Sequence, residues 1–389
     1  MNQTTLSLVA FGLPSSPTTF SGYARSLLIA LRSAGVLRHE YSVKPRCWID
    51  LLRSIRLTSP GTLRLRPHIS RRWIWSEPGA ELMSRRLDAE LRRRGDTGAF
   101  LQVGTLVRID PCHGPHYMLT DMTIPQARRA GHFAVSHLSR TQLDVAEAIQ
   151  RRRLQEAQHV FALCQWTAHS LVHDCGVKPE NISVVYAGSN LQLPEGVHEP
   201  RNPREILFVG IDWPRKGGPL LLKAFEIVHQ KFPDAILTVV GCNPKIDQPG
   251  VRIEGYLSRS DPVQLERLAR CFLRASCFCL PSVFDPFPNV LIEAASVGLP
   301  AVAIRNGSRA EVIVDGVTGR LVAAADPREL ADALIELLSD PERLLQFGRQ
   351  ARERAQREFT WERVVGRILA ATTEPGRGAA GRPGLDHTL

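Results

Sequence analysis

The sequence predicts an α/β protein with two doubly wound, Rossmann-like domains. Short apolar runs alternate with helix-like stretches along most of the 389 residues, and this alternation is typical of parallel sheets covered by helices on both faces. The pattern occurs twice, before and after a polar, proline-bearing segment at 194–203 that we interpret as a domain linker. Ligands of doubly wound domains bind at the carboxyl ends of the strands, so we expect functional residues in the loops that follow the strands.

The first half of the chain begins with a strand-like run and a loop rich in Gly, Pro, Ser and Thr at 12–22. The expected strands of this half are 6–11, 100–103, 117–120, 159–163 and 182–186. The expected helices are 23–37, 126–135 and 167–175.

The second half repeats the alternation more regularly. Gly298 and Pro300 follow the helix expected at 290–297, and this is the usual signal for the end of a helix. The expected strands of this half are 205–209, 235–240, 251–254, 277–280 and 301–304. The other expected helices are 218–232, 327–338 and 341–358.

These elements define the predicted domain limits. We expect an N-terminal domain at 1–193, the linker at 194–203 and a C-terminal domain at 204–358. A further helix is expected at 359–371. The Gly- and Pro-rich tail at 372–389 is expected to be disordered.

The net charge of +10 is unevenly distributed, and nearly all of the excess lies in the first half. A basic surface attracts polyanions, whereas for any single cluster a solvated surface is the alternative. We favour an anionic membrane or an acidic glycan as the partner. Nucleic acid is not expected, because no recognised motif or interleaved aromatic pattern is present. The arginine clusters are 71–72, 85–86, 92–94, 128–129 and 151–153.

No run of about 18 apolar residues predicts a membrane span. The N-terminus also lacks the basic and apolar regions of a secretory signal. We therefore expect a cytoplasmic protein with peripheral contact at the inner face of the membrane.

The segment 208–218 is the first candidate site. A strand ends in glycine, and a turn brings Arg215 and Lys216 to the start of a helix. Two cations and the free backbone N–H groups of a helix start suit a phosphate. A surface turn with solvated cations is the alternative interpretation.

The segment 281–295 is the second candidate site, and it also leads from a strand into a helix. The backbone N–H groups of Asn289 and Val290 are expected to be free for a phosphate. Glu293 lies one turn further, where its carboxylate can accept both hydroxyls of a ribose. The alternative is that Asp285 caps the helix and that Glu293 only interacts favourably with the helix dipole.

Together with a turn-rich segment at 307–319, these clusters resemble the retaining glycosyltransferases of family 4. The hallmark of that family is a Glu, seven residues and a second Glu, which here reads Asp285 to Glu293. The Lys-Gly of the family's phosphate-binding turn matches Lys216-Gly217, and a later Glu with an Asp-Gly-x-Thr-Gly turn matches 311–319.

The resemblance implies the GT-B architecture. In that architecture two Rossmann-like domains face each other across a cleft, and the last helix, here 359–371, crosses back to the N-terminal domain. The resemblance is strong over 206–322 and thin upstream of Val160.

The resemblance also assigns roles within the donor site. Lys216 would bind the donor diphosphate, and Glu293 would bind the ribose. Asp285 takes the place of the first Glu, which acts near the transferred sugar. Phe287, Asn289 and Val290 would form the loop over the phosphates and the sugar, and Gly22 matches a glycine loop of the first domain.

One cation of the family pattern is missing. The family has an Arg just after the strand, at the position of Ile211 in this chain. We expect Arg215 to replace it as the second cation at the diphosphate.

The acceptor side is expected at the end of the strand at 117–120. Asp121 would act as the acceptor's base or would position the acceptor, and a helix cap before Pro125 is an equal alternative. His113, His116 and His132 are further candidates of lower rank.

The implied reaction moves a sugar from a nucleotide-diphosphate sugar to a glycan or lipid-linked acceptor with retention of the anomeric configuration. No Asp-x-Asp motif suited to a divalent metal accompanies the diphosphate residues, so neither a metal nor another cofactor is expected. Two alternatives stay open. One is a GT-B-like enzyme such as a nucleotide-sugar epimerase. The other is a catalytically inactive binder of sugar or polyanion, which the departures at Asp285 and Ile211 suggest.

Overall fold

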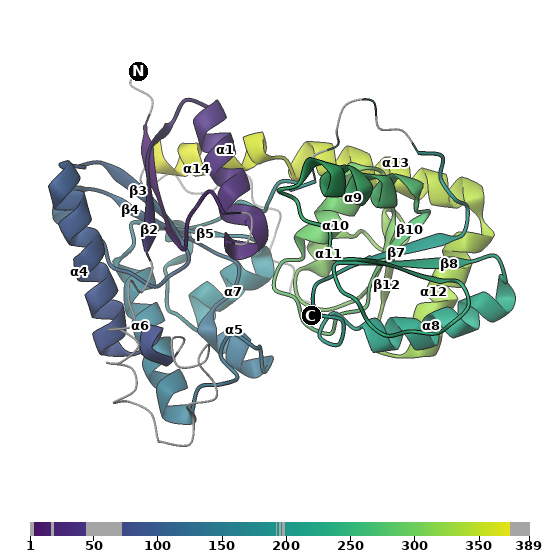
Figure 1. Cartoon of the computed structure of the whole chain (residues 1–389). Coiled ribbons are helices and arrows are strands. Elements are labelled where there is room, and N and C mark those ends of the chain that lie inside the picture. The colour runs from purple at the N-terminus through teal and green to yellow at the C-terminus, as the bar shows by residue number, and fades with distance from the viewer. Residues whose placement is uncertain are drawn as a thin grey trace. The chain divides into compact units, whose positions relative to one another are not determined.

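The structure is a computed structural model that describes residues 4–16, 19–43, 72–191, 193, 196 and 199–373. The chain divides into two compact units (Figure 1). The first unit comprises Met1–Tyr186 and Val364–Leu389, and the second comprises Ala187–Arg363. The domain limits expected from the sequence stay a prediction.

The described residues of the first unit form a six-stranded parallel sheet in the order β2-β1-β3-β4-β5-β6. The strand order reverses beside β1, and such a reversal opens a crevice at the carboxyl ends of the strands. The strands are β1 (Leu6–Phe11), β2 (Leu37–Val43), β3 (Ala99–Val103), β4 (His116–Thr120), β5 (His159–Ala162) and β6 (Ile182–Val184). The helices are α1 (Tyr23–Ser33), α4 (Glu77–Arg94), α5 (Ile124–Arg129), α6 (Arg140–Glu156) and α7 (Gln165–His173).

Two helix predictions in this unit were too long. The helix expected at 23–37 ends at Ser33, because Gly35 adopts a left-handed conformation with a φ of 70° and β2 begins at Leu37. The helix expected at 126–135 is α5, which ends at Arg129, shortly before Gly131 with a φ of 58°.

The second unit also contains a six-stranded parallel sheet, in the order β12-β11-β10-β7-β8-β9. This is the strand order of a Rossmann fold, with the reversal between β7 and β10. The strands are β7 (Glu205–Val209), β8 (Ile236–Val240), β9 (Val251–Gly255), β10 (Cys277–Leu280), β11 (Ala301–Ile304) and β12 (Gly319–Val322). The helices are α8 (Gly218–Lys231), α9 (Pro262–Arg274), α10 (Asn289–Ser296), α11 (Arg309–Val312), α12 (Pro327–Ser339) and α13 (Pro341–Glu358).

Helices cover both faces of this second sheet. Figure 1 shows α8 and α12 below the sheet and α9 and α10 above it. Apolar side chains of β7, β8, α8 and α12 form one buried core, for example Phe208, Leu237, Phe225 and Leu334. The last helix, α14 (Trp361–Thr373), begins in the second unit, and its residues from Val364 onward belong to the first. Residues 374–389 of the predicted tail lie outside the described residues.

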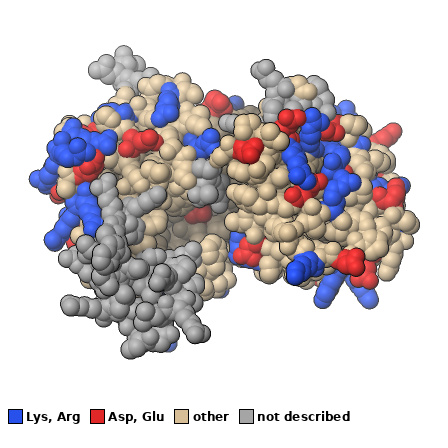
Figure 2. Space-filling model, viewed as in Figure 1, with Lys and Arg blue, Asp and Glu red and all other residues tan. Residues whose placement is uncertain are grey.

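The arginine clusters of the first unit are largely paired with neighbouring acids. On α4, Arg85, Arg92 and Arg94 each contact an acid one helical turn earlier, at 2.8–2.9 Å. On the described part of the visible surface, basic and acidic side chains are intermixed (Figure 2). Arg71 lies outside the described residues. Because nearby acids offset the charge of these arginines, the described clusters present less net positive charge than the arginines alone would suggest.

Candidate functional site

The turn after β7 and the loop after β10 touch each other at the point where the strand order reverses. β7 and β10 are neighbouring strands. Gly217 precedes α8 with a φ of 80°, and a Cβ atom at this position would lie 2.2 Å from the carbonyl oxygen of Pro281. Glycine is therefore required for this approach. The approach makes a compact site at the carboxyl edge of the sheet.

Lys216 and Asp285 meet at this site. The Lys216 ammonium donates to the Asp285 carboxylate, and the two side chains are only 14% and 11% exposed. The residue that caps α10 is Pro288, without a side-chain hydrogen bond. The alternative that Asp285 is a helix cap is therefore wrong.

The start of α10 borders the same loop. Asn289 and Val290 are the first two residues of the helix, so their backbone N–H groups have no partner within it. Phe287 is buried just before the helix. Free N–H groups, the positive end of the helix dipole and Lys216 together make this edge suitable for a phosphate group.

Glu293 is buried in α10 and is paired with an arginine. It is 2% exposed, and its Oε2 atom accepts from a guanidinium nitrogen of Arg259 at 2.8 Å. The charge of Glu293 is the main cause that raises the pKa of Arg259. Glu293 therefore has a specific cation as its partner, beyond the helix dipole.

Sequence reasoning missed Arg259. It lies in the loop between β9 and α9 and precedes Glu293 by 34 residues. No spacing rule connects the two positions, because the contact arises only when the loops of separate strands meet at one edge of the sheet. A basic residue in a loop after a strand was the only available signal.

Arg215 lies beside Lys216 but has a nearby acid as partner. Its Nε atom is 3.3 Å from a carboxylate oxygen of Asp212. Ile211, at the position of the missing cation, is 73% exposed. The role of Arg215 at a diphosphate stays a prediction.

In the first unit, Gly22 and Asp121 follow the strands β1 and β4 of one parallel sheet. Gly22 precedes α1 with a φ of 86°. Tyr23, the next residue, is buried, and burial followed by the negative charge of Asp121 raises its pKa well above the ordinary value. The charge of Asp121 therefore acts on the side chain that follows the glycine loop.

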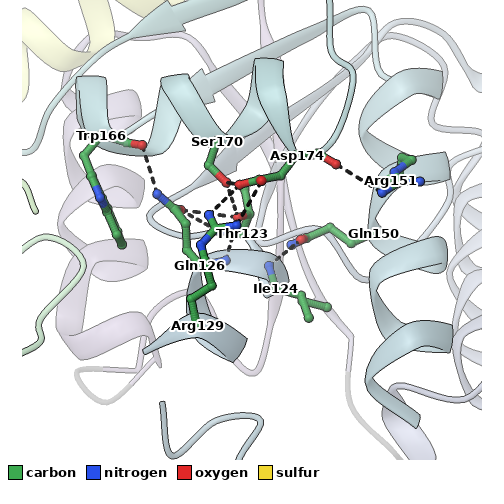
Figure 3. A network of polar contacts seen from close by, with 9 residues as sticks. All are labelled: Thr123, Ile124, Gln126, Arg129, Gln150, Arg151, Trp166, Ser170 and Asp174. Atoms are coloured by element: carbon green, nitrogen blue, oxygen red, sulfur yellow. Dashed lines mark hydrogen bonds and ion pairs between the residues drawn. The ribbon is translucent and has the colours of Figure 1, made fainter. Parts of the chain in front are cut away.

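A polar network joins the start of α5, just after Asp121, to α7, and Figure 3 shows its bonds around Thr123 and Gln126. Thr123, not Asp121, caps α5 through a reciprocal bond pair with Gln126, so the cap alternative for Asp121 is wrong. The backbone oxygen of Asp121 accepts a hydrogen bond of 2.5 Å from the hydroxyl of Thr167 on α7. The hydroxyl groups of Thr123 and Ser170 are 2.6 Å apart.

The three histidine candidates have other surroundings. His113 contacts Asp88 of α4 at 2.7 Å. His116 begins β4, at the strand end opposite to Asp121, and burial lowers its pKa to about 3. The ring of His132 packs on Phe133.

The described residues contain neither a candidate metal cluster nor a helix suited to cross a membrane. Within the described ranges, no group of three or more His, Cys, Asp or Glu side chains is arranged to hold a metal ion. No helix in the same part of the chain is long and apolar enough to cross a membrane. The expectation of a metal-independent reaction stays a prediction.

Two doubly wound parallel sheets, one in each unit, define the GT-B class of proteins. Residues 192–354 match the family Glycosyl transferases group 1. The fold class expected from the sequence is thus confirmed, and the expected family resemblance is confirmed over residues 192–354.

Curated relatives match a part of the chain. A MMP alpha-(1->4)-mannosyltransferase of Mycolicibacterium hassiacum is 29% identical over 57% of this chain and 55% of its own length. A D-inositol 3-phosphate glycosyltransferase of Corynebacterium glutamicum is 28% identical over 60% of this chain and 63% of its own length. The chain therefore spans less than two thirds of these relatives.

Solved structures share the fold over nearly the whole chain. A sucrose-phosphate synthase from Thermosynechococcus elongatus has a TM-score of 0.68 at 18% identity and covers 95% of this chain and 98% of its own. The Anabaena HepE protein in complex with UDP-glucose has a TM-score of 0.61 at 15% identity, with 95% and 99% covered. At such identities the likeness shows the fold alone.

Proposed function

We propose that the protein is a retaining glycosyltransferase that moves a sugar from a nucleotide-diphosphate sugar to a glycan or lipid-linked acceptor. The observation that carries the proposal is the convergence of Lys216, the start of α10 and buried Glu293 in the loops beside β7 and β10. The family of residues 192–354 supports the same reaction class.

The proposed chemistry depends on stabilising the leaving diphosphate. The bond between the anomeric carbon and the diphosphate oxygen breaks, and negative charge grows on that oxygen. Lys216 and the N–H groups of Asn289 and Val290 are fixed charges and dipoles that lower the energy of this state. Glu293, oriented by Arg259, accepts the ribose hydroxyls.

The acceptor oxygen forms the new bond on the face that the diphosphate leaves, and this retains the anomeric configuration. In this proposal the acceptor's proton passes to Asp121, while Gly22 lets the backbone approach the diphosphate. Both residues belong to the first unit, and the charge of Asp121 acts on Tyr23, the residue after Gly22.

The relatives suggest which substrates to try first. Several carry the name D-inositol 3-phosphate glycosyltransferase, and one is a phosphatidyl-myo-inositol mannosyltransferase of Mycolicibacterium smegmatis. Inositol phosphates and inositol lipids are therefore sensible acceptors to test. UDP- and GDP-sugars are the first donors.

The decisive experiment compares wild type with Glu293→Gln. Nucleotide-sugars are screened by thermal shift, and nucleotide release is then measured with and without an acceptor. A donor that stabilises wild type, with stabilisation and turnover lost in Glu293→Gln, would support the proposal. Glu266→Gln, on the more exposed side of α9, is the control and should behave as wild type.

Two further outcomes separate the alternatives. Conversion of the donor sugar without an acceptor would indicate an epimerase, and donor binding without any turnover would indicate an inactive binder. Turnover that persists in a chelator would agree with a metal-independent reaction, whereas loss restored by a divalent cation would contradict it.

A further inference from the structure

The loop that carries Asp285 is fastened to the short segment 306–309, which follows β11. Three hydrogen bonds connect the two segments, and their acceptors lie on both sides of Asp285 in the chain. They run from Asn306 Nδ2 to the carbonyl of Val283 at 2.8 Å, from Ser308 Oγ to the carbonyl of Pro286 at 2.6 Å, and from Arg309 Nη2 to Ser282 Oγ at 3.0 Å.

Arg309 is the unusual member of this segment. Its side chain is fully buried, the largest fully buried side chain among the described residues. One guanidinium nitrogen donates to the carbonyl of Asn306 at 2.9 Å, and Nε has no hydrogen-bond partner in the described part of the chain. Within the same part, no ion pair closer than 4.0 Å includes Arg309.

A buried guanidinium keeps its charge and loses its hydration, so its burial is costly without a nearby negative charge. Burial lowers the pKa of Arg309, and the charge of Asp285 acts in the opposite direction. Asp285 lies on the loop to which Arg309 and its neighbours are bonded, and its negative charge favours the charged form of this buried guanidinium.

Asp285 therefore has two cations in its surroundings, and they differ in mobility. Lys216 contacts it directly through a flexible side chain, whereas Arg309 is fixed by its burial and its hydrogen bonds. If Lys216 turns to a diphosphate, as the proposed function requires, Asp285 loses its direct partner while it is only 11% exposed. An unpaired buried carboxylate would oppose that movement.

We propose that Arg309 is a positioning residue that supplies the remaining counter-charge of Asp285 when Lys216 engages the donor diphosphate. This inference rests on the proposed function. It also adds to the donor site a buried cation, Arg309, to which the sequence analysis assigned no role.

The first test needs no ligand. Urea unfolding is measured for wild type, Arg309→Met, Asp285→Asn and the double variant. The midpoint should fall in Arg309→Met and should recover in part when Asp285→Asn is added, because the unpaired charge is then gone. A double variant whose midpoint falls by the sum of the single changes would overturn the proposed charge coupling.

The second test measures the affinity for UDP, GDP and ADP by calorimetry. For the nucleotide that wild type binds, Arg309→Met should weaken binding roughly 10- to 100-fold, the size expected when one buried polar group is left without a partner. Adding Asp285→Asn should restore the affinity to within a few fold, although turnover stays low. A residue that only fills the core would show no such rescue.

Three further variants separate the effect of the Arg309 charge from other effects of the substitution. Arg309→Lys keeps the charge and should retain more affinity than Arg309→Met. Ser282→Ala removes one hydrogen bond of Arg309 but no charge and should stay closer to wild type than Arg309→Met. If Arg309→Met does not fold, Arg309→Lys with and without Asp285→Asn keeps the proposal testable, and an affinity equal to that of wild type in both would contradict it. Arg305→Met is the matched control, because Arg305 is half exposed and pairs with Asp315 at 2.6 Å.

The two possible failures look different. If wild type binds a nucleotide and Arg309→Met binds it equally well, the inference on Arg309 is wrong and the proposed function stands. If wild type binds none of the nucleotides and none of the nucleotide-sugars, the proposed function is wrong and the inference falls with it.

Discussion

Gly217 and Gly316 of the second unit have similar backbone conformations but different surroundings. Their φ angles are 80° and 73°. A Cβ atom on Gly217 would collide with the Pro281 carbonyl, whereas a Cβ atom on Gly316 would meet nothing within 4 Å. The pair therefore separates the cost of the left-handed conformation from the cost of the close approach in the candidate site.

Replacing each glycine with alanine tests this difference. We expect Gly316→Ala to lower the free energy of unfolding by about 1 kcal/mol, the cost of the left-handed conformation for a residue with a Cβ atom. Gly217→Ala should lose roughly 1–3 kcal/mol more, because backbone must shift to admit the methyl group. Urea unfolding measures both values, and equal losses would contradict the steric argument.

The ion pair between Arg259 and Glu293 leads to a second prediction. Arg259→Met leaves a buried carboxylate without its cation, so the free energy of unfolding should fall by roughly 2–4 kcal/mol. The affinity for a nucleoside diphosphate should fall as well, because Glu293 is no longer oriented.

Arg267→Met is the control for Arg259→Met. Arg267 pairs with Glu254 at 2.6 Å, but its side chain is 59% exposed. Its loss should cost less than about 1 kcal/mol. Equal effects of the two substitutions in urea unfolding would show that burial of Glu293 does not decide the strength of the pair.

At the scale of elements, β4 and β5 each begin with a buried histidine. His116 and His159 are the first residues of these strands. Burial lowers the pKa of His116 to about 3 and that of His159 to about 4. Both side chains are therefore neutral in the folded protein at neutral pH, because a buried position in the sheet disfavours the charged form.

The pH dependence of stability follows from these values. Below about pH 6.5 the unfolded chain binds protons at both histidines, while the folded chain does not until about pH 3–4. Stability should therefore fall on acidification through this window, by up to about 1.4 kcal/mol per pH unit for each histidine.

Urea unfolding between pH 7 and pH 4.5 checks this dependence. His116→Leu should reduce the slope of the unfolding free energy against pH, whereas His173→Asn, at an exposed position at the end of α7, should keep it. An unchanged slope in His116→Leu would mean that this histidine is protonated equally in both states.

At the scale of the whole molecule, the basic character of the first half is the property for which the structure differs most from the sequence-based expectation. The excess of basic residues lies in the first half of the chain. The described clusters there are mostly paired with Glu or Asp, as Arg152 is with Glu77 at 2.9 Å. Contact with an anionic membrane therefore stays a proposal, and it would depend on the net charge rather than on any one cluster.

A flotation assay tests that contact. We expect the protein to float with vesicles that contain anionic lipid at low salt, and to be released at about 0.5 M salt, where the Debye length is only a few ångströms. Vesicles of neutral lipid are the control. An absence of binding to anionic vesicles at low salt would count against the proposal.

Much of the fold was predictable from the sequence, because the local signals are strong. Buried parallel strands are short apolar runs, and glycine and proline mark where they stop, so β7, β10 and β11 were located at their observed limits. Long polar helices such as α4 were missed, because few of their residues face the core and the apolar period is weak.

The site shows the same division. The sequence by itself determined the two sheets, the family and the candidates Lys216, Asp285 and Glu293, since all of these depend on residues close together in the chain. Only the tertiary structure decided their partners. Arg259 pairs with Glu293 from the loop after β9, and Arg309, at the start of α11, is bonded to the loop that carries Asp285. Parallel topology gathers those loops at one edge of the sheet, and burial there turns distant charges into specific pairs.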